Sequence, residues 1–276
     1  MPILTDYHVH TPLCKHATGP LERYIERAIE LGLREIGFSD HCPLPGGLGG
    51  DERMTEGELD LYVDTVLRMR QYFVDRIEVK LGLEIEYVEG QEEYCRRLME
   101  KHPWDYLIGT VHYLEPDCRR LSWSRDLAES PSQLYARYFA QLRRLIHAGL
   151  CDIIGHFDIP KRSGRPPTPH EQEDIANTLE EIAAAGLCLE VNTSGYRHLE
   201  LAAPEPYPSL STVEQAIALD IPLVVNSDAH DPAHVGEHFH PIEQFLLSRN
   251  CSALASFTRR KRVMYPLENG RRARSR

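Results

Sequence analysis

The sequence predicts an α/β fold in which a parallel sheet closes into a barrel, and two observations lead to it. Short apolar and β-branched runs recur along the 276-residue chain, each typical of a buried strand: residues 3–8, 35–39, 79–85, 106–112, 152–157, 187–192 and 222–227. Segments with helical periodicity separate these runs, so strands and helices alternate. No break in composition divides the chain, and we expect one domain over residues 1–276. An open, doubly wound sheet is the alternative.

Helix start and stop signals support this alternation. Pro20 precedes one helical segment and Gly32 follows it, which is the usual arrangement at helix ends. Three pairs have the spacing of a capping box, in which a hydroxyl residue and a Glu three positions later satisfy the first backbone groups of a helix: Thr55 with Glu58, Thr168 with Glu171, and Ser211 with Glu214. We found no glycine-rich phosphate loop between a strand and a helix, which removes the usual reason to prefer a nucleotide-binding fold.

The charge of the chain argues against some partners. Its 31 Lys and Arg residues face 42 Asp and Glu residues, a formal net charge of −11. Nucleic acids and anionic membranes draw affinity from a dense basic surface, so we expect neither as a partner. We interpret the basic residues near the end of the sequence as part of a solvated tail: Arg259 to Arg262, Arg271, Arg272, Arg274 and Arg276. The basic C-terminal tail itself is expected from about residue 266.

The compartment is predicted from the first residues and the cysteines. The start MPILTDYHVH has no basic segment followed by an apolar one, and no apolar run approaches the roughly 18 residues that a membrane span requires. Seven cysteines with no CxxC pair are typical of reduced thiols, so we expect a cytoplasmic protein. Cys14 and Cys42 lie near histidines in the sequence and are interpreted as small apolar filler.

Side chains that bind metals follow six of the seven predicted strands. In chain order they are His8, His10, His41, Glu84, His112, His156, Asp228 and His230. Only the sixth strand, which ends at Asn192, lacks one. Because the carboxyl ends of the strands of a parallel barrel face one mouth, we expect these side chains to converge there.

The types and spacing of these residues favour a metal site. In His8-Val9-His10 the alternation of a strand turns both imidazoles to one side, and Asp228-Ala229-His230 repeats the pattern. Imidazole and carboxylate together favour zinc, manganese or iron, and the absence of thiolates from the set argues against a structural zinc. The alternative, a polar network inside an apolar core, is disfavoured by its cost. The remaining histidines lack this placement and are assigned no role: His102, His147, His170, His198, His234, His238 and His240.

These motifs together resemble the PHP (polymerase and histidinol phosphatase) superfamily. The resemblance runs from residue 6 to about residue 240 through Asp6-Tyr7-His8-Val9-His10, His16, Ser39-Asp40-His41, Gly82-Leu83-Glu84, Val111-His112, Gly155-His156 and Ser227-Asp228-Ala229-His230. It implies a distorted (β/α)7 TIM-like barrel with up to three divalent metal ions (Zn, Mn or Fe) at its mouth. It further implies three ligand sets: His8, His10, Glu84 and Asp228; Glu84, His112 and His156; and His16, His41 and His230. Asp6 and Asp40 would orient imidazoles or cap the backbone.

Three phrases resemble the histidinol-phosphatase branch of the superfamily: Ser39-Asp40-His41-Cys42-Pro43-Leu44-Pro45, Gly155-His156-Phe157-Asp158 and Asn192-Thr193-Ser194-Gly195-Tyr196-Arg197 with the preceding Glu190-Val191. The resemblance implies hydrolysis of L-histidinol phosphate to L-histidinol and phosphate, in which a metal-bridging hydroxide attacks phosphorus. Asp228, His230 and Glu84 would be catalytic, with Asp228 or His230 passing a proton to the leaving alkoxide. Arg162 and Arg197 are candidates for binding the phosphate, since a guanidinium pairs with two of its oxygens.

Alternatives remain open at this point. In the first alternative, the chain is a phosphatase that acts on another phosphomonoester or on a nucleotide. In the second, it hydrolyses a C–N bond, as amidohydrolases do. In the third, it binds metal without catalysing a reaction. Glu86, Glu115 and Asp158 are all candidate partners for a substrate amine, and the sequence does not choose among them. It also leaves the oligomeric state open.

Overall fold

Seven parallel strands form a nearly closed barrel in the computed structural model, which describes residues 3–124, 129–198 and 204–267. The strands follow one another around the barrel in chain order, and each pairs in parallel with the next. They are β1 (Thr5–Asp6), β2 (Glu35–Phe38), β3 (Glu78–Glu86), β4 (Tyr106–Thr110), β5 (Ile153–Ile154), β6 (Cys188–Asn192) and β7 (Leu223–Asn226). The predicted barrel is confirmed, and the open sheet was the wrong alternative.

The barrel closes between its first and last strands through a few contacts beyond their ends. Val9 and Ala229 form an isolated parallel bridge, and the amide of Tyr7 donates to Oδ1 of Asn226 at 2.8 Å. Two backbone hydrogen bonds extend this seam, from His10 to the carbonyl of Ala229 and from Ala229 to the carbonyl of His8. The closure therefore lies directly beside the residues predicted to bind metal.

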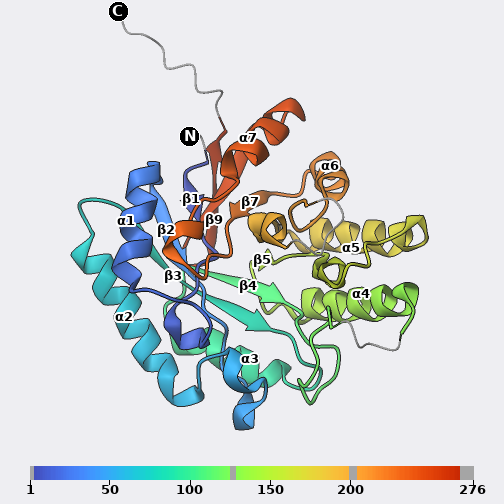
Figure 1. Cartoon of the computed structure of the whole chain (residues 1–276), viewed down its shortest axis with the longest axis horizontal. Helices are drawn as coiled ribbons and strands as arrows, with labels where there is room; N and C mark the ends of the chain where they lie inside the picture. Colours follow the sequence, from blue (N-terminus) through green and yellow to red (C-terminus); the bar gives the residue numbers. More distant parts are fainter. Residues whose placement is uncertain (1–2, 125–128, 199–203, 268–276) are drawn as a thin grey trace, which may run out of the picture.

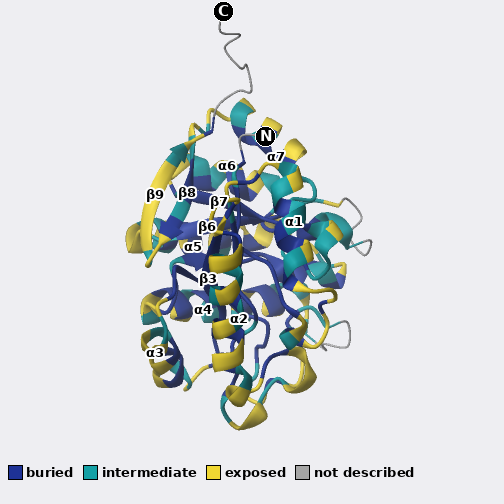
Figure 2. Ribbon diagram, turned by 90° about the vertical axis from the view of Figure 1, so that its left-hand side faces the viewer, coloured by how far each residue is buried: buried dark blue, intermediate teal, exposed yellow. Residues whose placement is uncertain are grey.

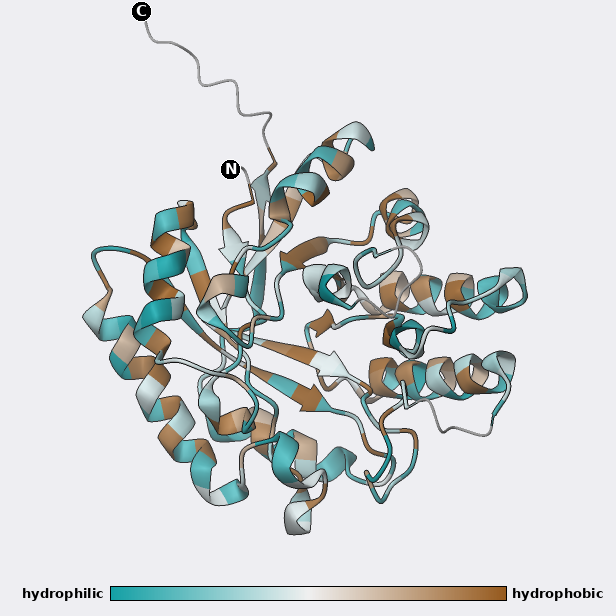
Figure 3. Cartoon of the chain, viewed as in Figure 1, coloured by the Kyte–Doolittle hydropathy of each residue, from teal (hydrophilic) through white to brown (hydrophobic). Residues whose placement is uncertain are grey.

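The long helices surround the barrel (Figure 1). They are α1 (Leu21–Leu31), α2 (Leu59–Tyr72), α3 (Glu92–Lys101), α4 (Pro131–Ala148), α5 (Gln172–Ala185), α6 (Leu210–Ala218) and α7 (Phe239–Ser248). Each helix has apolar residues toward the strands and polar residues outside, so the colours of burial and hydropathy alternate along it (Figures 2 and 3). None of the helices in the described ranges has the length and apolar character needed to cross a bilayer.

Two of the three predicted capping boxes are present. Thr55 with Glu58 begins the short 3₁₀ turn before α2, and Thr168 with Glu171 begins the one before α5. The box predicted at Ser211 is wrong, because α6 begins at Leu210 with Ser209 as its cap residue.

The end of the barrel opposite the predicted site is filled by a hairpin of β8 (Ala253–Thr258) and β9 (Lys261–Pro266). From β8, Ala255 and Phe257 enter a buried cluster with inward-facing strand residues: Tyr7, Tyr106, Ile108, Ile153, Cys188 and Val224. The ring of Tyr106 lies across two strands, so that a Cβ at Gly37 or Gly82 would lie 2.3 Å from it. Glycine is therefore needed at both positions for the ring to fit.

The hairpin corrects the interpretation of Arg259 to Arg262 as a solvated tail. Arg259 and Arg260 form its turn with positive φ values of 51° and 62°. The Arg260 guanidinium pairs with Asp152, Nε to Oδ2 at 2.9 Å, and Arg262 donates to the carbonyl of Gly186 at 2.7 Å. Arg260 and Arg262 therefore bind specific acceptors that precede the amino-terminal ends of β5 and β6. The other basic residues of the predicted tail, Arg271, Arg272, Arg274 and Arg276, lie outside the described residues.

Candidate metal centre

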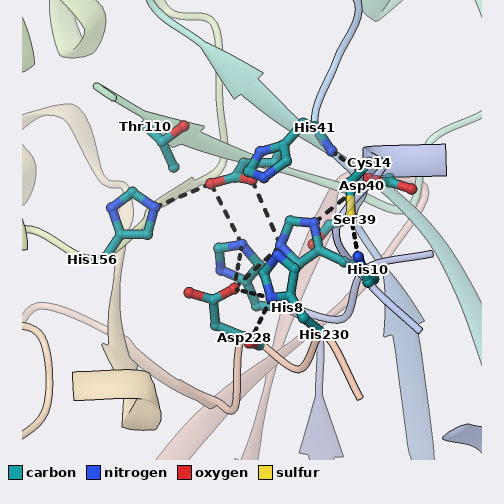
Figure 4. Close-up of polar contacts among 12 residues, drawn as sticks. His8, His10, Cys14, Ser39, Asp40, His41, Thr110, His156, Asp228 and His230 are labelled. Atoms are coloured by element: carbon teal, nitrogen blue, oxygen red, sulfur yellow. Dashed lines mark hydrogen bonds and ion pairs between the residues drawn. The ribbon is translucent and has the colours of Figure 1, made fainter. Parts of the chain in front are cut away.

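All nine predicted metal ligands meet at the carboxyl-terminal mouth of the barrel. His8 and His10 follow β1, His41 follows β2, Glu84 lies in β3, His112 follows β4, His156 follows β5, and Asp228 and His230 follow β7. His16 comes from the loop after the 3₁₀ turn Pro12–Cys14. In Figure 4, His8, His10, His41, His156, Asp228 and His230 point toward one another from these separate elements.

Glu84 is the centre of this group. It is 1% exposed, and imidazole nitrogens surround both of its carboxylate oxygens. Around Oε1 lie Nε2 of His156 at 3.1 Å, of His8 at 3.4 Å and of His112 at 3.5 Å. Around Oε2 lie Nδ1 of His41 at 2.5 Å and Nε2 of His10 at 3.8 Å. A carboxylate with imidazoles beside both oxygens could hold a cation together with them.

A second group of imidazoles lies on the outer side of this centre. His16, His41 and His230 each offer a nitrogen within 4.8 Å of the other two. His230 stacks on His10 with ring centroids 3.9 Å apart, which connects the two groups. Oδ1 of Asp228 lies between them, 3.2 Å from Nε2 of His10 and 3.5 Å from Nδ1 of His230.

Buried carboxylates hold three of the imidazoles from behind. Nδ1 of His8 lies 2.7 Å from Glu190, Nδ1 of His112 lies 2.6 Å from Glu86, and Nδ1 of His10 lies 3.5 Å from Asp40. In each case the contact on Nδ1 leaves Nε2 facing the centre. Asp40 also accepts from the amides of Thr11 at 3.2 Å and His41 at 2.9 Å, so it caps the backbone, the other role considered for it, and Nδ1 of His10 makes no hydrogen bond within the described residues. Asp6 instead accepts from the amide of Ser227 at 2.9 Å and from that of Gly236 at 3.1 Å, so it holds the loop that carries Asp228.

Glu190 was missed at the sixth strand, for which the sequence indicated only an end at Asn192 without a metal-binding side chain. Its side chain is fully buried in β6 and accepts four hydrogen bonds. The donors are Nδ1 of His8 at 2.7 Å, Nδ2 of Asn226 at 2.8 Å, the amide of His156 at 2.7 Å and Nδ2 of Asn192 at 3.0 Å. The signal was available, because Glu190 and Asn192 are two residues apart and therefore face the same side of an otherwise apolar strand.

Two of the nine residues have unusual backbone angles. His156 has a φ of 22° and Asp228 a φ of 52°, a region that residues with a side chain rarely adopt. Each is fixed by a neighbour: Glu190 accepts from the amide of His156, and Arg197 donates through Nη2 to the carbonyl of Asp228 at 2.8 Å. Such backbone geometry persists only where surrounding contacts impose it, and here it aims both side chains into the centre.

The electrostatics favour charged carboxylates in the centre. Burial opposes the ionised form of Glu84, but His41, His8 and His112 outweigh it and bring the pKa of Glu84 well below its usual value. Burial holds the pKa of His41 and of His230 well below the usual value, with His10 acting in the same direction. Burial also lowers the pKa of His8, but Glu190, Asp228 and Glu84 raise it more, so the centre favours positive charge at this point.

The donor atoms in the centre fit divalent cations. Nε2 of His8, His10 and His230 are buried without a hydrogen-bond partner in the described part of the chain. Leaving such atoms unpaired is costly, and a cation between them would satisfy all of them. Cys14, interpreted above as filler, also has its sulfur within 4.8 Å of ring nitrogens of His10 and His230. The set of imidazole nitrogens and carboxylate oxygens is the kind that zinc, manganese and iron prefer.

A cavity of about 390 Å³ opens above the centre. Its floor includes Glu84, Asp228 and the imidazoles of His16, His41, His112, His156 and His230. Its walls are formed by Glu52, Arg53, Tyr113, Leu121, Trp123, Ile159, Arg162, Ser194, Arg197 and His198. Arg162 and Arg197 were predicted here, whereas Glu52, Arg53, the two aromatic residues and His198 were not, because loops carry them without a recognisable pattern. The floor and walls together form a polar cavity with several cationic side chains.

The two predicted arginines differ in their contacts. The guanidinium carbon of Arg162 lies 5.0 Å from the ring centre of Trp123, and its nitrogens make no hydrogen bond to any residue in the described ranges. Arg197 donates through Nη2 to the carbonyls of Ser227 and Asp228, both at 2.8 Å, and through Nη1 to Glu237 at 3.2 Å. Within the described residues, Arg162 thus has more N–H donors available for a ligand than Arg197. The hydrogen bonds of Arg197 fix the loop that carries Asp228.

Comparisons with known proteins agree with this geometry. A family model described as PHP domain matches residues 6–194. The chain is 36% identical over 245 residues to a protein of Deinococcus radiodurans named "Probable histidinol-phosphatase", which covers 86% of this chain and 90% of that one. It is 27% identical over 258 residues to the histidinol-phosphatase of Bacillus subtilis, covering 84% and 95% of the two chains.

A solved structure has the same fold. The histidinol phosphate phosphatase of Lactococcus lactis, crystallised with zinc, L-histidinol and phosphate, superposes with a TM-score of 0.81 at 18% identity. The match covers 95% of this chain and 99% of that one.

Proposed function

This chain belongs to the PHP domain family, and on that premise we propose that it is a histidinol-phosphatase. It hydrolyses L-histidinol phosphate to L-histidinol and phosphate. The observation that carries the proposal is the carboxylate of Glu84 surrounded by five imidazoles beneath an open cavity, in a chain that matches a curated relative over 86% of its length. The proposal treats residues 1–276 as one catalytic domain.

Three divalent metal ions, Zn, Mn or Fe, are part of the proposal. Their ligands are those of the three sets named above: His8, His10, Glu84 and Asp228; Glu84, His112 and His156; and His16, His41 and His230. The third set coincides with the outer group of imidazoles, and Glu84 is shared between the first two. Ions held there would activate a water molecule as the nucleophile and offset the negative charge of the phosphate oxygens.

The protein's own side chains have three tasks in this reaction. Glu84 fixes the spacing of the imidazoles around it. Asp228 or His230, at the rim of the centre and 3.5 Å apart, takes up the proton that the attacking water loses and passes it to the alkoxide that leaves. Arg162 and Arg197 on the cavity wall bind the phosphate. A guanidinium can donate two hydrogen bonds to two oxygens of one phosphate and so replaces the hydrogen bonds that the anion makes with water.

A panel of substrates tests the proposal. Purified enzyme loaded separately with zinc, manganese and iron is assayed on L-histidinol phosphate, other phosphomonoesters, nucleotides and amides. We expect the highest kcat/KM on L-histidinol phosphate. A preference of tenfold or more for another phosphomonoester or nucleotide would assign a different phosphatase activity to the same centre, and turnover of amides alone would overturn the proposed phosphatase.

A further inference from the structure

The wall of the cavity carries one carboxylate, besides those of the centre, whose charge has no partner. Glu52 ends the 3₁₀ turn Gly50–Glu52 between β2 and α2, and its side chain lines the cavity. It makes no ion pair with any residue in the ranges that the structure describes. The other two carboxylates of the lining, Glu84 and Asp228, are engaged with imidazoles of the centre.

Glu52 lines the same cavity as residues of the proposed centre, among them Glu84, His112 and Asp228. Tyr113 directly follows His112 and lines the cavity beside Glu52. Glu52 therefore faces the same space as the proposed ligands, from the segment between β2 and α2.

The three carboxylates that the sequence left as partners for a substrate amine are engaged elsewhere. Glu86 is buried between His112 and Arg53, and Asp158 is fully buried against Lys161 at 3.1 Å. Glu115 pairs with Arg137 at 3.2 Å. None of the three is among the residues that line the cavity.

The remaining charged groups on the wall are cations. Arg53 is 4% exposed and pairs with Glu86 at 3.3 Å, while Arg162 and Arg197 have the contacts described above. A wall of this kind suits a phosphate but would repel the ammonium group of L-histidinol phosphate, which sits on the carbon next to the one bearing the ester oxygen. An unpaired carboxylate at the rim removes that conflict.

We propose that Glu52 binds the substrate's ammonium group and so sets the preference for an amino alcohol ester over a simple phosphomonoester. The inference rests on the proposed function, because it assigns the residue that recognises the amine of that substrate. Glu52 contacts the substrate away from the reacting phosphorus, so it is a specificity-determining residue. Its carboxylate is solvated when the cavity is empty and becomes paired when the substrate enters.

The test compares two esters that differ only in the amine. L-histidinol phosphate and its deamino analogue, 3-(imidazol-4-yl)propyl phosphate, are assayed with the wild type, Glu52→Gln and Glu52→Asp. The ratio of kcat/KM between the two esters should fall roughly tenfold in Glu52→Gln, as for one lost charge-assisted hydrogen bond at a partly solvated site, and recover in part in Glu52→Asp. The matched control is Asp51→Asn, an exposed acid on the same turn that does not line the cavity, and its ratio should equal that of the wild type.

Inhibition by the two products gives a second measurement. The inhibition constant of L-histidinol should rise in Glu52→Gln by a similar factor, whereas that of inorganic phosphate, which has no amine, should change much less. If the wild type hydrolyses L-histidinol phosphate but Glu52→Gln keeps its ester ratio and its L-histidinol inhibition, Glu52 does not bind the amine and the proposed function stands. If the wild type fails to hydrolyse L-histidinol phosphate, both the proposed function and this inference are overturned.

Discussion

Oε1 of Glu190 lies 2.7 Å from Nδ1 of His8, deep in the barrel and behind the metal centre. Burial alone would raise the pKa of Glu190, but the charge of His8 and the hydrogen bonds to the carboxylate lower this pKa by more. The carboxylate is therefore ionised and can only accept hydrogen bonds. Nδ1 of His8 therefore donates to Glu190, and Nε2 of the same ring faces Glu84 at 3.4 Å. The same carboxylate holds the amide of His156, so one side chain orients two proposed ligands.

Replacement of Glu190 by Gln should weaken metal binding. The amide keeps the shape of the side chain but brings its own NH2 group toward donors that need an acceptor. We expect metal affinity to fall about 10- to 100-fold, which is the usual effect of losing a residue that orients a metal-binding histidine. Zinc titration and metal content after dialysis measure it, with Glu180→Gln on the exposed face of α5 as the control. Unchanged zinc affinity would show that His8 needs no such orientation.

The sequence predicted the centre because its ligands follow strands, and a parallel barrel gathers strand ends at one mouth. Its limits have the same physical origin. Glu190 lies inside a strand rather than after it, and only the packed structure shows that its four acceptor positions are filled. Arg260 looks like part of a basic tail until the hairpin turn brings it to Asp152, which is 108 positions away. Glu52 lies in a loop, where no period predicts the direction of a side chain.

Removal of metal should abolish turnover. We expect enzyme dialysed against a chelator to be inactive and Mn²⁺, Co²⁺, Fe²⁺ or Zn²⁺ to restore it better than Mg²⁺, because the centre offers mostly imidazole nitrogens. Activity is followed together with metal content by elemental analysis. Full turnover in a sample without bound metal would contradict the proposed centre.

The two cavity arginines should respond differently to truncation. Arg162→Ala should lower kcat/KM on L-histidinol phosphate by about 10- to 100-fold with the melting temperature and metal content kept, since its guanidinium faces the cavity and Trp123. Arg197→Ala should lower the melting temperature and metal content as well, because it also releases the carbonyls of Ser227 and Asp228. Calorimetry, metal analysis and kinetics on both variants check this. Equal behaviour of the two would remove the distinction between them.

The capping box before α2 should give a pH-dependent contribution to stability. Oε2 of Glu58 accepts from the amide of Thr55 at 2.8 Å and Oε1 pairs with Lys15 at 2.6 Å. The hydrogen bond from Lys15, with those from Thr55, lowers the pKa of Glu58 from 4.5 to about 2. A depressed carboxylate pKa stabilises the folded state above the unfolded value, so this stabilisation is present above pH 4.5 and is lost as the pH falls toward 2.

Glu58→Gln should therefore lower the free energy of unfolding by about 1 kcal/mol at pH 7, which is typical of a lost helix cap. The difference from the wild type should narrow at pH 4, where the wild type begins to lose its advantage. Urea unfolding at both pH values measures it, with Asp51→Asn as a control that removes a nearby charge without removing a cap. A difference that stays constant between the two pH values would show that the charge of Glu58 has no part in it.

Phe257 should be among the most costly residues to truncate outside the site. Phe257 is 3% exposed, and its ring lies edge-on to that of Tyr7 with centroids 6.4 Å apart, in the buried cluster that also contains Tyr106. Phe257→Ala should lower the free energy of unfolding by about 3–5 kcal/mol, the usual range for an aromatic residue removed from a core. The exposed Val263 of β9 provides a matched control, since Val263→Ala in the same hairpin should change it by less than about 1 kcal/mol. A small effect of Phe257→Ala would mean that the hairpin does not complete the core.

The hairpin also bears on how the protein is made. All nine proposed ligands have left the ribosome once residue 230 has, whereas the side chain that seals the other end of the barrel arrives with residue 257. A nascent chain in that interval has every group needed to bind metal but still exposes Tyr7, Tyr106 and their apolar neighbours to solvent. That surface is what chaperones recognise and what drives aggregation, so the vulnerable moment of synthesis falls after the catalytic groups are complete and before the barrel is sealed.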